Sequence, residues 1–309
     1  MVTTGGLSVD RSAGIVEGLR PRVFPRIDAL LSGSGPLFSM NSSLLKYWKL
    51  FDLGLQNTFV YRWNFLLRMV FGIVPLFGMV FIWQAIFASK GTEISGYDYH
   101  GMIFYFLVTV FLDNLITPTE DEWQIAGEIR DGKLSAYLVK PMSYLGYRIS
   151  TYLSYRLLYI AIVFIPILAL AFIFRDAIRF PQHAITWPAL ALSTAMAAGI
   201  QFFIAYAMAM IAFWVLEIST IVFLLYSFEY FLSGHIFPLD IMPAWFQPFV
   251  KWSPFTYELF FPAQIAMERI QGRALAEGLA IQAGWLIITF CAARLLWRKG
   301  LKKYQAVGG

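Results

Sequence analysis

The run AITWPALALSTAMAAGIQFFIAYAMAMIAFWVL, residues 184–216, contains no charged side chain. A membrane-spanning helix needs about 20 mostly apolar residues, so this run predicts one spanning helix together with its turn. The whole chain has 309 residues, of which 59% are hydrophobic and 14% charged. Soluble domains usually carry about 25% charged residues. One aqueous core cannot bury so much apolar surface, so the composition predicts an all-helical membrane protein.

Further apolar runs along the chain complete the predicted membrane domain, residues 66–300. Each is close to the length of a spanning helix, and Pro75 is expected to kink the first one. Together with 184–216 they predict about six spans. The other runs are 69–89, 101–118, 157–174, 218–232 and 279–297.

The N-terminal part predicts two different segments. Residues 1–40 are rich in Gly, Ser and Arg and lack an apolar stretch, so we expect a disordered tail and treat Met40 as a candidate start. Residues 41–65 predict an amphipathic helix lying in the headgroup plane, because apolar residues recur at helical spacing with polar ones between them. The alternative is an ordinary amphipathic helix packed on protein. The apolar positions are Leu44, Trp48, Phe51, Leu55 and Phe59.

The distribution of Lys and Arg predicts the orientation. Segments 1–68, 119–156 and 294–309 hold roughly three times as many as the loops between them. Cytoplasmic loops carry this excess, so both termini, including the tail 301–309, are expected in the cytoplasm. We interpret the net charge of +5 as a topology signal and expect no nucleic-acid partner.

Small residues recur within the 184–216 run. Ala191, Ala195 and Gly199 follow at four-residue spacing. Such a ridge lets two helix backbones approach closely. It predicts close packing against another helix of this chain or against a second copy.

The charged segment EDEWQIAGEIRDGKLSAYLVKP, residues 120–141, predicts a short helix just under the membrane. Acids in a first turn favour a helix start, and Gly132 is expected to end the helix. Acids and a Trp exposed on such a helix suit docking into a groove on a soluble partner, and the alternative is a solvated loop helix without a partner. The apolar stripe comprises Trp123, Ile125, Ala126 and Ile129, with a second patch from Leu134; the polar positions are Glu120, Asp121, Glu122, Glu128, Arg130 and Asp131.

Two carboxylates fall within predicted spans. Asp113 and Glu229 would be costly in lipid, so each is expected to face a cavity or a partner. They are candidates for a substrate path or a proton site. The alternative is a helix-end residue, or one hydrogen-bonded to a neighbouring helix.

Catalytic motifs are absent from the sequence. The three histidines are far apart, the single Cys291 lies in an apolar run, and no HExxH, CxxC or GxSxG pattern occurs. The phosphate loop GxxxxGK[ST] is also absent, so we expect no enzyme activity, no metal site and no ATP binding by this chain.

The chain resembles the permease subunits of ABC-2 type transporters, in particular the small bacterial six-span branch. The resemblance covers residues 41–303 as an architecture. Its motif is Glu-x-x-x-Gly-x-Leu-x-x-x-Leu-x-x-Pro after the second span, here Glu128, Gly132, Leu134, Leu138 and Pro141.

The resemblance implies a fold and a function. Residues 119–141 would contain the coupling helix that docks on a separate cytosolic ATPase, which would bind ATP and Mg. The broken segment 235–262 would form outer re-entrant helices, as in type V exporters. Two permease subunits, identical or related, would form a path in a bacterial inner membrane, exporting a lipid, glycan, drug or peptide. The alternatives are a membrane scaffold, or an ion-coupled transporter driven through Asp113 or Glu229.

Overall fold

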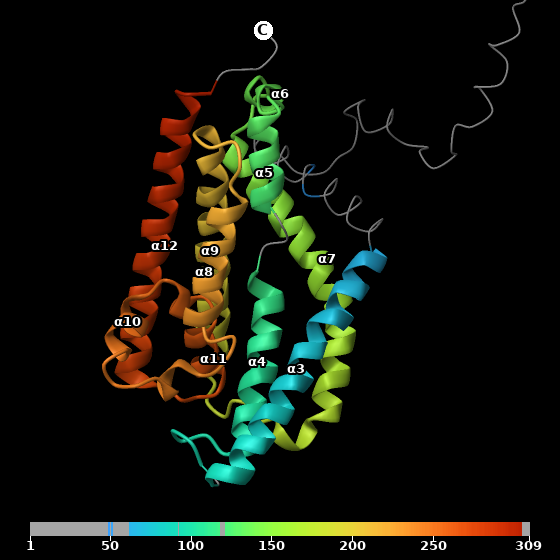
Figure 1. The fold of residues 1–309 in the computed structure, drawn as a ribbon, viewed down its shortest axis with the longest axis vertical. Coiled ribbons are helices and arrows are strands. Elements are labelled where there is room, and N and C mark those ends of the chain that lie inside the picture. The colour runs from blue at the N-terminus through green and yellow to red at the C-terminus, as the bar shows by residue number, and fades with distance from the viewer. Residues whose placement is uncertain (1–48, 50, 52–61, 92, 118–120, 305–309) are drawn as a thin grey trace, which may run out of the picture. The chain divides into compact units, whose positions relative to one another are not determined.

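The computed structural model describes residues 49, 51, 62–91, 93–117 and 121–304. This part of the chain is helical, with no named strand and an isolated bridge between Ile94 and Tyr97 (Figure 1). The predicted tail 1–40, nearly all of the predicted interfacial helix 41–65 and the last residues of the C-terminal tail lie outside the described residues.

Long apolar helices make up most of the described chain, and each overlaps one of the predicted runs. Their apolar residues recur without a charged interruption long enough to end them, and Pro75 and Pro166 lie inside helices. The helices are α3 (Arg62–Lys90), α4 (Tyr99–Ile116), α7 (Tyr144–Ile173), α8 (Thr186–Met210), α9 (Ser219–Leu232) and α12 (Gly272–Leu301).

By length and composition, three of the described helices can cross a membrane. They are α4, α12, and α8 continued by the short helix η2 (Ile211–Phe213). Helix α7 adds a fourth if its parts on either side of the Pro166 break, which meet at 45°, form one span. Helix α9 has 14 residues and rises about 21 Å, less than the about 30 Å of a hydrocarbon core. The structure therefore supports three to four spans, and six stays a prediction.

Short helices gather at the two ends of this helical bundle (Figure 1). At one end, here called the α5 end, α5 (Asp121–Arg130) and α6 (Ser135–Leu138) lie near the last turns of α12. At the other, the α11 end, the chain between α9 and α12 breaks into short helices. These are η3 (Leu239–Ile241), α10 (Gln247–Trp252), η4 (Phe255–Tyr257) and α11 (Phe260–Ala266). The predicted broken segment 235–262 thus has the expected interrupted form, and its re-entry into a membrane stays a prediction.

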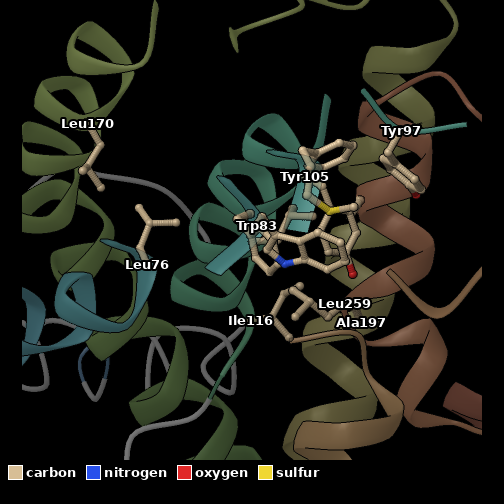
Figure 2. Close-up of a cluster of buried hydrophobic side chains, with 13 residues drawn as sticks. Leu76, Trp83, Tyr97, Tyr105, Ile116, Leu170, Ala197 and Leu259 are labelled. Carbon is tan, nitrogen blue, oxygen red and sulfur yellow. The ribbon is translucent and has the colours of Figure 1, made fainter. Parts of the chain in front are cut away.

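Helix α8 is the centre of the packing. Gly199 lies against the side chain of Leu286 on α12, so the predicted close approach is to a helix of the same chain. Ala191 and Ala195, the other members of the ridge, are exposed. Figure 2 shows a buried cluster in which Trp83 of α3, Tyr105 of α4 and Ala197 of α8 meet. Burial of these side chains joins the first helices of the bundle to its centre.

Hydrogen bonds fix the chain that follows α9 against α4. The Tyr105 hydroxyl donates to the Gly234 carbonyl at 2.6 Å, and the Tyr97 hydroxyl donates to Asp240 Oδ2 at 3.0 Å. Gly234 has φ +93°, and a Cβ there would meet the Tyr105 hydroxyl. A side chain is therefore excluded at this position, and the connection stays close to α4.

Two glycines of α12 provide a matched test of this packing. A Cβ at Gly278 would meet the ring of the buried Phe261, whereas a Cβ at Gly284 meets nothing. We expect Gly278→Ala to lower the free energy of unfolding by about 1–3 kcal/mol through overpacking. Gly284→Ala should be neutral or raise it by about 0.4–1 kcal/mol. Thermal unfolding of both variants in detergent measures this, and equal stabilities would contradict the packing.

Candidate functional site

The segment 121–141 packs on the bundle through one face of α5. Ile125 and Ile129 are buried against Phe202 and Met210, as the apolar stripe of the sequence predicts. Ala126 packs in a second buried cluster with residues of α8 and α9. The segment is therefore a fixed part of the bundle and not a free loop.

A turn between α5 and α6 is held by the C-terminal end of the bundle. Gly132 has φ +74°, so it ends α5 as predicted. Its carbonyl accepts a hydrogen bond from the Tyr304 hydroxyl at 2.8 Å, and the Ser135 amide donates to the same hydroxyl at 3.2 Å. Leu134, fully buried, also donates its amide to the Glu128 carbonyl at 3.0 Å. Residues distant in sequence thus close the turn.

A buried ion pair lies at the centre of the segment. Arg148 Nη2 is 2.5 Å from Glu128 Oε2, and the two side chains are 1% and 10% exposed. The Tyr144 hydroxyl donates to Glu128 Oε2 at 2.7 Å and accepts from Arg148 Nε at 3.0 Å. The sequence predicted a polar, exposed face for Glu128, and this is wrong. Its carboxylate turns inward because a buried guanidinium on α7 supplies the donors that desolvation requires.

Further contacts extend this pair to four helices. Arg148 Nη1 donates to Gln124 Oε1 of α5 at 3.2 Å, and the Tyr137 hydroxyl of α6 lies 3.4 Å from Glu128 Oε1. The ring of Tyr144 stacks on Trp297 of α12, with centroids 5.1 Å apart. Burial raises the pKa of Tyr137, so its hydroxyl stays a donor at neutral pH.

The exposed surface of the segment is smaller than the sequence suggests. Trp123 is 40% exposed, and Arg130 lies in solvent beside Asp131. Hydrogen bonds from Lys133 and Arg130 lower the pKa of Asp131. Glu122 is 3% exposed, so its predicted exposure is also wrong. Glu120 and the side chain of Asp121 lie outside the described residues.

A cavity with apolar walls and a few polar groups lies inside the bundle, away from this segment. It encloses about 300 Å³ between α3, α4, α7, the last turn of α9 and His235. Asp113 lines it with a side chain that is 37% exposed, and His235 Nε2 is 3.3 Å from Asp113 Oδ1. The Ser233 hydroxyl contacts His235 Nδ1 at 2.6 Å, and the ring of Tyr230 stacks on His235. Asp113 therefore faces a cavity and, near the end of α4, also contacts His235, so features of both predicted alternatives are present.

Glu229 has different surroundings. It is 6% exposed and accepts a hydrogen bond from Gln201 Nε2 at 2.6 Å. It does not line the Asp113 cavity. Glu258 is 2% exposed, and neither of its carboxylate oxygens has a hydrogen-bond partner among the described residues. The two predicted carboxylates thus lie in separate sites, and the structure adds a third that the sequence did not single out.

A family model described as "ABC-2 family transporter protein" matches residues 73–308. The chain belongs to the ABC-2 transporter family. Members are generally non-catalytic membrane components of ABC transporters, and the apolar helices agree with a multi-pass membrane protein. No curated protein matches the chain.

The residues that anchor the segment of this ABC-2 protein were not singled out from the sequence. Arg148 was counted only as a positive charge of an inner loop, although Tyr144 and Arg148 are four residues apart at the start of α7. That spacing places both on one face of the helix. The sequence did not indicate a role for Tyr304 or Trp297, because only the folded chain brings the end of α12 beside α7 and the turn at Gly132.

The ion pair gives a stability test within the segment. Glu128→Ala leaves Arg148 buried without its counter-charge, and we expect a loss of about 3–5 kcal/mol. The matched control, Asp131→Ala, removes an exposed carboxylate three residues away and should leave the unfolding midpoint at the wild-type value. Thermal unfolding in detergent distinguishes the two. A wild-type midpoint for Glu128→Ala would contradict the buried pair.

Proposed function

We propose that this chain is the permease subunit of an ATP-driven transporter and that a separate ATPase subunit docks on α5 and α6. The observation that carries the proposal is a partly exposed Trp123 on a helix that is otherwise fixed to the bundle. Aromatic side chains are common anchors of protein interfaces. The alternative of a solvated helix without a partner leaves a rigidly held Trp in water without a role.

The contacts of the segment suit the transmission of force. A displacement of α5 pulls on Glu128, which is bonded to Arg148 of α7. The same displacement acts on Tyr304 through the Gly132 turn and so reaches α12. The ion pair is buried, and buried, packed contacts switch between discrete arrangements more readily than they deform gradually. ATP-driven closure of the ATPase subunits would in this way change the access of the path.

The proposal also names the partner subunits, the nucleotide and the membrane. ATP and Mg are bound by the ATPase, because the sequence of this chain has no phosphate loop. The Lys and Arg distribution supports cytoplasmic termini, which puts the α5 end on the ATPase side. The bacterial inner membrane follows only from the resemblance to small bacterial permeases. A second permease subunit, identical or related, completes the transporter, and nucleic acid is not a partner.

The Asp113 cavity is our candidate for part of the substrate path. Its walls combine apolar residues of α3, α4 and α7 with polar groups at Asp113 and His235. Such a lining suits an amphipathic cargo among the lipids, glycans, drugs and peptides that this kind of transporter exports. Glu229 is the second candidate, although its burial separates it from this cavity.

Two other functions remain as competitors. A membrane scaffold without transport would bind no ATPase. An ion-coupled transporter is favoured by Asp113 and by the buried Glu229, and its uptake would depend on protons and be abolished by Glu229→Gln. Copurification of an ATPase from the native host discriminates between these and the proposed permease.

A change at Trp123 tests the docking surface. We expect the wild-type chain, isolated from its native host in mild detergent, to retain a nucleotide-binding subunit with ATPase activity. Trp123→Ala should reduce the recovered ATPase several-fold, because truncating a Trp that is a hot spot of an interface costs about 2 kcal/mol or more. Mass spectrometry and an ATPase assay of the eluate measure both.

The control for this experiment is Trp245→Ala. Trp245 is 73% exposed and lies at the α11 end, so its removal should leave ATPase recovery unchanged. Equal recovery in the two variants would refute docking at Trp123, and a wild-type chain that never retains an ATPase would refute the permease function.

A further inference from the structure

A second cavity lies at the α5 end of the bundle. It encloses about 360 Å³ and is walled by α6, α7, α8 and α12. Tyr137, Tyr144 and Trp297 form aromatic walls, and Arg294 and Arg298 line it from α12. This cavity shares no lining residue with the Asp113 cavity.

The charge of the cavity is positive and unbalanced. Arg294 and Arg298, one helical turn apart, are both exposed, and neither has an ion pair or hydrogen bond with the described part of the chain. No carboxylate lines the cavity among the described residues. The nearest acid of the segment, Glu128, already accepts from Arg148 and Tyr144. Two unpaired guanidinium groups beside aromatic walls favour an anion that accepts hydrogen bonds in pairs.

A buried hydroxyl adds a second observation. Tyr206 lines the cavity, is 2% exposed, and its hydroxyl has no hydrogen-bond partner among the described residues. A buried hydroxyl left unpaired is costly. A ligand with acceptor oxygens would supply the missing partner.

The rim of the cavity is apolar. Leu138 and Leu301 line it and are 41% and 36% exposed, and Leu295, beside Arg294, is 53% exposed. Both arginines lie in the last turns of α12, a helix apolar enough to cross a membrane. Guanidinium groups at this place meet the level of the lipid headgroups, with apolar side chains toward the acyl region.

We propose that this cavity binds the phosphate headgroup of an anionic phospholipid. Arg294 and Arg298 contact the phosphate oxygens, Tyr206 donates to a headgroup oxygen, and the leucines contact the acyl chains. The bound lipid touches Tyr137 and Tyr144, the same residues that hold Glu128. Lipid binding therefore stabilises the segment 121–141. The proposal needs only the membrane placement of the chain and does not depend on ATPase docking.

Thermal unfolding of the detergent-solubilised chain tests the proposal. Dioctanoyl phosphatidylglycerol should raise the unfolding midpoint of the wild type, and dioctanoyl phosphatidylcholine should not. In the double variant R294Q/R298Q we expect the rise to disappear or to need about tenfold more lipid or higher. The matched control K302Q/K303Q removes the same charge from exposed positions outside the cavity and should keep the response.

Several outcomes would overturn the proposal. An unchanged phosphatidylglycerol response in R294Q/R298Q, or an equal response to phosphatidylcholine, excludes this anionic lipid site. Inorganic phosphate that raises the midpoint as much as the lipid identifies a soluble ligand instead. If R294Q/R298Q fails to fold, the variant Tyr206→Phe tests the site instead, because it removes only a hydroxyl that has no partner among the described residues and should leave the fold intact. Weaker phosphatidylglycerol binding by native mass spectrometry supports the site, and unchanged binding refutes it.

Discussion

The Glu128–Arg148 pair is the interaction on which the architecture of the α5 end depends. Both charges are removed from water, which costs several kcal/mol per ion unless geometry and hydrogen bonds compensate. Tyr144, Tyr137 and Gln124 supply the compensating bonds, so each also becomes fixed in place. A short helix that would be marginal on its own is thereby held as a rigid element. Because the Glu128–Arg148 pair holds α5 in place, Trp123 on α5 is also held in a fixed position at the surface.

The buried ion pair divides α5 into a side that packs on the bundle and a side that is exposed. The buried side of α5 carries structure, and the docking that we propose is confined to its small exposed area. The first two residues of the motif that begins at Glu128 lie on the structural side: Glu128 is buried, and Gly132 forms the turn after α5. Residues of the motif are therefore poor choices for probing contact alone, and Trp123 is a better one.

Much of the fold could be predicted because apolar runs have a clear length scale. The positions of α4, α8 and α12 follow from it, whereas α7 begins at Tyr144, well before the predicted run 157–174. The glycine that ends α5 was predicted separately, from its residue type. The number of spans could not be settled, because α9 is short and α7 is bent, and hydropathy does not report bends. The partners of Glu128 and Asp113 were missed for another reason. Arg148 and His235 could not be recognised as partners from the sequence, because only the fold brings them to Glu128 and Asp113. His235 lies 122 residues from Asp113.

Helix α12 carries close contacts along its whole length. Gly278 lies under Phe261, Gly199 of α8 lies under Leu286, and Gly300 lies under Phe213. The contacts at Gly199 and Gly300 resist sliding of α12 relative to α8 and η2, because such a displacement would bring the Leu286 side chain or the Phe213 ring into backbone, while Phe261 belongs to α11. We therefore expect α8 and α12 to move together. In the cycle that we propose, a displacement that reaches α12 through the Gly132 turn would carry α8 with it, and the Asp113 cavity, lined by α3, α4, α7 and α9, would change shape against this pair.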